Sequence, residues 1–185
     1  MKIGQSALIY RGSREGDTCG EVTVARNGVM QPLDPRNDIR RHSIKDLSWG
    51  YSGSGPAQLS LAILADYFGA TKEGDRLAES LYQDFKTQAI APQRKDIWEM
   101  TGAEVGQTLV GILVEDPRTV PRVVSDLRTH YFNRWCADHE GSEDPDAWDN
   151  AKIDAWCDEQ IKAFLGDYLP LKPETISGFI KASAP

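Results

Sequence analysis

The stretch WGYSGSGPAQLSLAILADYFG, residues 49–69, decides the fold of this 185-residue chain. Its first seven residues hold three glycines and two serines, a composition typical of a turn. Pro56 follows, and proline suits the first turn of a helix because its missing N–H would have no partner there. Apolar residues then recur as far as Phe68, and Gly69 is suited to a helix end. The stretch therefore predicts a glycine-rich turn followed by a helix over residues 56–68.

Short strands are predicted on the N-terminal side of this stretch. Residues 7–11 and 21–25 are rich in β-branched and aromatic side chains and partly alternate in polarity. Asn27-Gly28 follows the second strand, and this dipeptide favours a two-residue hairpin turn with positive φ at both positions. A hairpin is therefore predicted over residues 21–33. The prolines that come next end the pairing and begin a loop.

Helices dominate the C-terminal side. The spacing of apolar residues predicts one helix over residues 75–89, a second after the capping box at 101–104, and two longer ones after Pro117 and Pro145. Residues 97–98 suit either a short strand or a turn. Strands that precede helices indicate an α+β fold, with an N-terminal antiparallel hairpin or small sheet packed on helices and a mainly helical C-terminal half.

We expect residues 1–100 to form an α+β core that contains the glycine-rich turn. Residues 101–185 are expected to be a helical extension packed on the same core. With 40% hydrophobic and 26% charged residues, the chain has the composition of an ordinary globular protein. No segment approaches the roughly 18 apolar residues of a membrane span, and the N-terminus lacks a signal-peptide pattern. The three cysteines Cys19, Cys136 and Cys157 do not form a disulfide framework, so we expect a cytoplasmic protein.

Charge is distributed unevenly within a net charge of -7. Residues 1–47 carry eight Lys/Arg against six Asp/Glu, whereas residues 138–168 carry ten Asp/Glu against two lysines. Such an asymmetry indicates either a solvated helix face or a surface for a charged partner. The predicted acidic partner face includes Asp146, Asp149 and Glu159.

The glycine-rich turn has the layout of an anion site. Glycines allow a ligand to approach the backbone, and the first N–H groups of a helix have no partner within the helix. The turn lacks the lysine of a P-loop and the dinucleotide pattern, so no cofactor is predicted. The alternative is that the turn only begins a helix and reaches into the core. The predicted ligand- or partner-binding residues are Arg40, Arg41, His42, Gly50, Tyr51, Ser52, Gly53, Ser54, Gly55 and Gln58.

Catalytic and metal sites have weaker sequence support. Ser52 or Ser54 could be combined with His42 and an aspartate such as Asp38, but a triad is recognised by its geometry. No catalytic residue is therefore assigned, and the sequence leaves enzymatic activity open while favouring a non-enzymatic protein. Four side chains have the chemistry of zinc ligands, but their spacing matches no familiar zinc motif and no metal is predicted. These four are His130, Cys136, His139 and Cys157.

The motif WGYxGSGPAQLxLAIL at 49–64, LYQDFK at 81–86 and Trp98 resemble a small uncharacterised family found in phage, plasmid and other bacterial genomes. The resemblance covers roughly residues 7–100. This chain has Ser52 where that family usually has glycine. The resemblance implies no established activity. It implies a role in host interaction, including inhibition of a bacterial defence system such as CRISPR.

Two functions follow as hypotheses. The first is a non-enzymatic binding protein of mobile-element type, which occupies a host protein, a host protein complex or a nucleic-acid-binding surface. The alternative is a small protein or enzyme that binds a nucleotide or another phosphate-containing ligand at the 50–55 turn. The sequence leaves direct contact with nucleic acid open.

Overall fold

A computed structural model describes the chain except for residues 1–6, 16–19, 44–46 and 184–185, so Cys19 lies outside the described residues. Four antiparallel strands form one sheet in the order β3-β2-β1-β4. The strands are β1 Leu8–Ser13, β2 Glu21–Arg26, β3 Val29–Pro32 and β4 Ile97–Thr101. The α-helices are α1 Ser54–Phe68, α2 Lys72–Phe85, α3 Gly102–Glu115, α4 Thr119–Asp138, α5 Asn150–Tyr168 and α6 Pro173–Ala182. The predicted α+β class, with a small N-terminal sheet and a helical C-terminal half, is confirmed.

The predicted hairpin is formed by β2 and β3. Asn27 has φ 50° and Gly28 has φ 82°, as the two-residue turn requires. Strand β1 pairs with β2 on one side and with β4 on the other, where Gly12 lies opposite Trp98. Residues 97–98 suited either a strand or a turn, and they form the strand β4.

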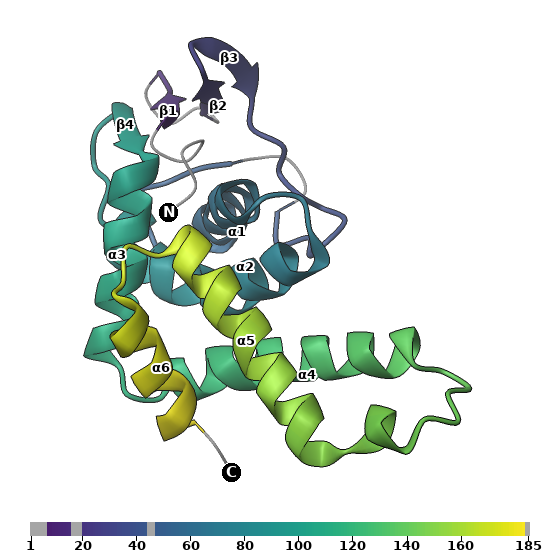
Figure 1. The fold of residues 1–185 in the computed structure, drawn as a ribbon. Coiled ribbons are helices and arrows are strands. Elements are labelled where there is room, and N and C mark those ends of the chain that lie inside the picture. Colours follow the sequence, from purple (N-terminus) through teal and green to yellow (C-terminus); the bar gives the residue numbers. More distant parts are fainter. Residues whose placement is uncertain (1–6, 16–19, 44–46, 184–185) are drawn as a thin grey trace.

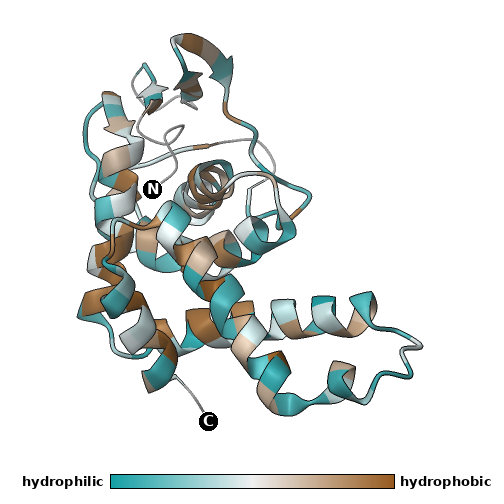
Figure 2. Cartoon of the chain, viewed as in Figure 1, coloured by the Kyte–Doolittle hydropathy of each residue, from teal (hydrophilic) through white to brown (hydrophobic). Residues whose placement is uncertain are grey.

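Helix α1 lies beneath the sheet at the centre of the molecule (Figure 1). The Tyr10 hydroxyl donates to Asp66 Oδ2 over 2.9 Å and so connects β1 to the last turn of α1. Nearly every residue of α1 is buried, which explains why its sequence is apolar on all sides. The apolar colouring of this helix is visible in Figure 2.

Helix α2 begins three residues earlier than the spacing predicted, because the Thr71 side chain caps it by accepting from Gly74 N. Its end is also different. The chain continues as a π-helix, η2 Lys86–Ile90, in which Ala91 N donates to Lys86 O over 2.8 Å. This wider turn brings Ile90 into the core, where it is 1% exposed.

The C-terminal helices share one buried cluster with the sheet and α1. The capping box of Thr101 and Glu104 forms as predicted at the start of α3. Phe68 at the end of α1 lies 5.6 Å from Tyr168 and 6.3 Å from Phe164, measured between ring centres. Tyr67 donates from its hydroxyl to the Tyr168 carbonyl over 2.7 Å. The division at residue 100 stays a prediction.

Helices α4 and α5 form a hairpin that extends away from the rest of the molecule (Figure 1). Pro145 begins a short 3-10 helix, η3 Pro145–Trp148, and Asp149 then caps α5. The last helix, α6, is absent from the predicted set. Across the described ranges, none of the helices combines the length and apolar character needed to cross a membrane.

Candidate functional site

The glycine-rich turn is tied to the segment that follows η2. Trp49 is fully buried and its Nε1 donates to the Lys95 carbonyl over 2.8 Å. Gly50 has φ 87°, which favours glycine, and its N–H donates to Ile90 O over 3.1 Å. The Gly50 amide, the first of the 50–55 turn, is therefore hydrogen-bonded within the chain.

Two arginines that the sequence did not single out contact the carbonyls of this turn. Arg14 Nη1 donates to Trp49 O over 3.0 Å, and its guanidinium lies 4.9 Å from the centre of the Trp49 ring. Arg94 donates to Gly50 O. Arg14 also pairs with Asp96 over 3.0 Å, so the arginines beside the turn are engaged in contacts within the chain, and none of them belongs to the predicted binding set.

The other glycines allow Tyr51 to fold back over the turn. The Tyr51 hydroxyl lies 2.8 Å from Ser48 Oγ, and a side chain at Gly53 would lie 2.5 Å from the Tyr51 ring. Tyr51 remains half-exposed, and Ser52 and Ser54 are exposed beside it. The turn therefore presents one aromatic ring and two hydroxyls to solvent.

Gln58 is buried and organises the loop that precedes the turn. Its Oε1 accepts from His42 N over 2.7 Å and from Ser43 N over 3.3 Å. Its Nε2 donates to Pro35 O over 2.5 Å and to Arg40 O over 3.1 Å. All four bonds go to backbone atoms of the chain, so this side chain holds the loop in place.

The three basic residues before the turn do not act together. Arg40 contacts α2, at 3.5 Å from both Glu79 and the Tyr82 hydroxyl. His42 packs on the Tyr82 ring at 4.8 Å between centres, and burial together with Arg40 lowers the pKa of His42. Arg41 is exposed and has no ion pair among the described residues. Ligand binding by this set with the turn stays a prediction.

A second polar site lies between α2 and α4, which we call the α2–α4 groove. Its cavity of about 660 Å³ is lined by residues of both helices. Glu73 Oε1 lies 3.2 Å from His130 Nε2 and 3.6 Å from Arg134 Nη1. Partial burial opposes ionisation of Glu73, but a hydrogen bond from its own backbone amide and the neighbouring His130 ring together lower its pKa overall. This carboxylate therefore joins the two helices in its charged form.

Glu73→Gln is expected to destabilise the protein by about 1 kcal/mol at neutral pH. The folded-state pKa of Glu73 is below the ordinary value of 4.5, so its contribution is present above that pH and lost as the pH falls through the folded value. Urea unfolding at pH 7 and pH 3 should show the difference between wild type and variant shrinking with acid. The exposed Glu159→Gln serves as the control. An equal difference at both pH values would contradict this role.

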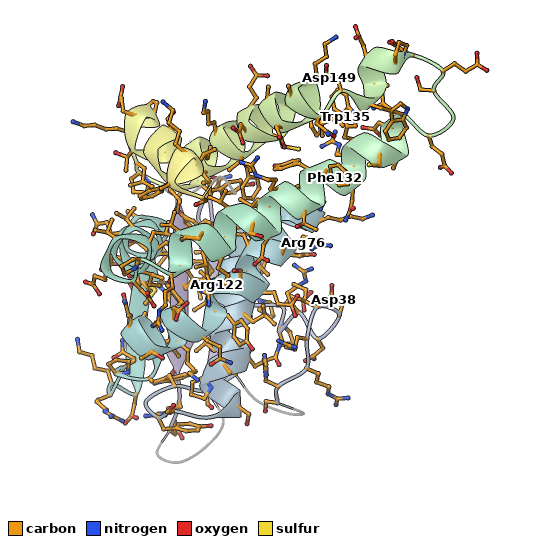
Figure 3. All side chains as sticks on the ribbon, turned by 90° about the horizontal axis from the view of Figure 1, so that it is seen from below. Asp38, Arg76, Arg122, Phe132, Trp135 and Asp149 are labelled. Carbon is orange, nitrogen blue, oxygen red and sulfur yellow. The ribbon has the colours of Figure 1, made fainter. Side chains whose placement is uncertain are left out.

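The tip of the α4–α5 hairpin is held by aromatic and capping contacts. The rings of Trp135 and His139 stack at 4.2 Å, and Trp135 Nε1 donates to Ala147 O over 2.8 Å. Asp144 accepts from Asp146 N over 3.0 Å and so starts η3. These contacts fix the loop that connects the two helices. Figure 3 shows Trp135 and Asp149 together at this end of the hairpin.

The residues of the predicted acidic face have different roles. Asp149 accepts from Ala151 N and Lys152 N, so it caps α5. Asp146 pairs with Lys152. Glu159 lies ten residues after Asp149, within α5, and is exposed. Of these three residues, the structure brings Asp146 and Asp149 together at the tip. Partner binding by the acidic face stays a prediction.

Three of the four residues with zinc-ligand chemistry have other contacts, and Cys136 is a partly buried free cysteine. His130 faces Glu73, His139 stacks on Trp135, and Cys157 is buried on the face of α5 that packs against α4. Burial raises the pKa of the Cys157 thiol, which favours its neutral form. In the described part of the chain, no three His, Cys, Asp or Glu side chains are arranged to hold a metal ion.

Comparison with known families gives one result. A model described as a family of unknown function (DUF6166) matches residues 10–111. The match includes the sheet, the glycine-rich turn and most of α3, and it ends before the α4–α5 hairpin. Neither the curated proteins nor the solved structures give a match.

Proposed function

Because the chain belongs to this family of unknown function (DUF6166), whose model matches more than half of it, we propose its function from geometry. It is a non-enzymatic binding protein that docks a partner protein on the tip of the α4–α5 hairpin. The observation that carries this proposal is the half-exposed Trp148, which lies in the acidic segment 138–149. This segment connects α4 to α5 at the end of the projecting hairpin (Figure 1).

Exposure of Trp148 is the first support. The side chain is 48% exposed, although Ala147 beside it is buried and Trp135 is turned inward. Tryptophan is enriched among the residues that dominate binding energy at protein interfaces. The hairpin contacts described above hold the loop in one conformation, so little conformational entropy would be lost on binding.

The charge of the tip indicates the chemistry of the partner. Residues 138–149 contain six Asp/Glu and no Lys or Arg, although Asp138 and Asp146 pair with Arg134 and Lys152 outside this range. The other four carboxylates repel one another, and a cationic surface would relieve that repulsion and speed association. The partner surface is therefore rich in lysine and arginine, as a nucleic-acid-binding surface is.

The biological setting is a further part of the proposal. The motif at 49–64 resembles a family of phage and plasmid genomes, which supports a partner in the bacterial host cytoplasm and a role against a host defence system. The hairpin lies outside the matched residues 10–111. This supports a division of roles in which the family core carries a contact arm particular to this chain.

The alternative function, binding of a phosphate-containing ligand at the 50–55 turn, ranks second. It is supported by the guanidinium groups of Arg14 and Arg94, which lie beside the turn. It is weakened because both arginines already donate to carbonyls of the turn and Gly50 N is paired. No catalytic residue is assigned in either case.

Trp148→Ala and Glu140→Lys/Glu143→Lys are expected to abolish recovery of the partner when tagged protein is incubated with bacterial lysate. The two glutamates are exposed and neither caps a helix, so the fold is retained. Loss of an interface tryptophan typically costs about 2 kcal/mol or more, or roughly 30-fold in affinity. Mass spectrometry of the captured proteins and titration of the recovered partner would measure the effect.

Matched variants at the other end of the molecule provide the controls. Ile97→Ala removes a more exposed apolar side chain from β4, and Glu21→Lys/Glu115→Lys makes the same charge change away from the tip. These variants should recover the partner as wild type does. Equal recovery by all variants would exclude the tip as the contact surface.

A further inference from the structure

The α2–α4 groove is lined by cationic side chains, and some of them form no ion pair among the described residues. Lys72, Arg76 and Arg134 line it, with Glu73 and Asp75 as its carboxylates. Glu73 lies close to His130 and pairs with Arg134. Asp75 Oδ2 accepts from Arg36 Nη2 over 2.8 Å. Within the described residues, Lys72 and Arg76 have no carboxylate partner.

The placement of these two cations is unfavourable for the isolated protein. Lys72 and Arg76 are four residues apart on α2, so their side chains lie on the same face and repel each other. Lys72 is also the first residue of the helix, where the helix dipole is positive. An anion between them would remove both penalties. Figure 3 shows Arg76 beside α4, on the groove side of α2.

Arg134 adds a third cation from the opposite helix. It is half-exposed, and its ion pairs with Glu73 and Asp138 are long, at 3.6 and 3.8 Å. These long ion pairs position the Arg134 guanidinium but leave N–H donors available. A guanidinium can bind phosphate oxygens through two parallel hydrogen bonds.

The groove has room for a ligand. The cavity of about 660 Å³ is within the usual size range of small-molecule sites.

We propose that the α2–α4 groove binds a phosphate-bearing small molecule, such as a sugar phosphate or a nucleotide. The phosphate lies between Lys72, Arg76 and Arg134. Two uncompensated positive charges match a phosphate monoester, which carries about two negative charges at pH 7, better than a single carboxylate. This site is separate from the hairpin tip and does not depend on the protein-binding function.

Isothermal titration with inorganic phosphate, glucose 6-phosphate, ATP and adenosine tests the proposal on the full chain. Glucose 6-phosphate or ATP should bind more tightly than inorganic phosphate, and adenosine should not bind. Lys72→Ala/Arg76→Ala should weaken binding at least tenfold, and Arg134→Gln should weaken it by a smaller factor. Lys162→Ala/Lys181→Ala removes the same charge from exposed positions of α5 and α6 and should change affinity less than twofold.

Several outcomes would overturn the proposal. These are no binding of any phosphate compound, equal affinity in the Lys72→Ala/Arg76→Ala and wild-type proteins, or equal loss in the control pair. A short DNA duplex that binds more tightly than every small phosphate would show that the groove recognises nucleic acid instead. Inorganic phosphate binding as tightly as glucose 6-phosphate and ATP would contradict the assignment to an organic phosphate. Circular dichroism of each variant separates these results from misfolding, which is not expected because both replaced side chains are exposed.

Discussion

Replacing Gln58 with leucine is expected to lower the free energy of unfolding by about 3 kcal/mol, because each hydrogen bond lost contributes roughly 0.5–1.5 kcal/mol. The side chain is 1% exposed and bonds to two amides and two carbonyls of the loop at 35–43. Leucine has a similar volume, so the cost arises from unpaired backbone groups rather than from a cavity. Chemical denaturation monitored by tryptophan fluorescence would measure it.

A glutamate at the same position separates the two halves of this network. Gln58→Glu keeps an acceptor for His42 N and Ser43 N but places a carboxylate oxygen against the carbonyls of Pro35 and Arg40. It should therefore be destabilising as well. Gln107→Leu, on an exposed position of α3, is the matched control and should change stability by less than about 0.5 kcal/mol. Similar stability of Gln58→Leu and Gln107→Leu would show that the loop does not depend on Gln58.

Phe68→Ala is expected to destabilise the protein by about 3–5 kcal/mol, the usual cost of removing a buried phenylalanine ring. Phe68 is fully buried at the end of α1 and packs on Phe164 and Tyr168 of α5. Most small proteins are stable by only about 5–15 kcal/mol, so this change would remove a large part of the total. Because the ring contacts both halves of the chain, one cooperative transition at lower denaturant concentration should be seen.

Phe132→Ala is the control for the same chemical change. Phe132 is 45% exposed on α4, so its truncation should cost less than about 1 kcal/mol. Calorimetry and fluorescence should give coincident transitions for wild type and for Phe68→Ala. Two separate transitions in the variant would show instead that residues 1–100 and 101–185 unfold independently.

Features encoded within a few residues could be predicted from the sequence. Asn27-Gly28 gives the β2–β3 turn, and Thr101 with Glu104 gives the start of α3, because each motif contains both partners of its own hydrogen bonds or backbone geometry. The α+β class followed from the order of such segments. The start of α2 was placed too late because the cap at Thr71 precedes the apolar spacing.

Features that depend on distant segments could not be predicted. The pairing of β1 with β4 brings Gly12 beside Trp98, and nothing local in either strand indicates the other. The α2–α4 groove has the same origin, because its cations come from two helices whose facing sides are set by packing. The acidic stretch was recognised from the sequence, but Trp148 within it was not singled out, and a tryptophan among six acids in residues 138–149 could have indicated the hairpin tip.

The candidate residues show the same limit. The sequence located the glycine-rich turn, but it could not show that Gln58 bonds to the preceding loop or that Asp149 caps α5. Polar residue types are equally suited to ligand contacts and to internal hydrogen bonds, and only the partner distinguishes them. Arg14 and Arg94 were missed because neither adjoins the turn in sequence.

The π-helix η2 constrains how this chain can change during evolution. Insertion of one residue within 86–90 would rotate the following chain by about 100° relative to α2. Ile90 would leave the core, and its carbonyl would no longer accept from Gly50 N. Insertions should therefore be absent from this segment among relatives, so the glycine-rich turn and η2 are inherited as one unit although they lie far apart in the sequence.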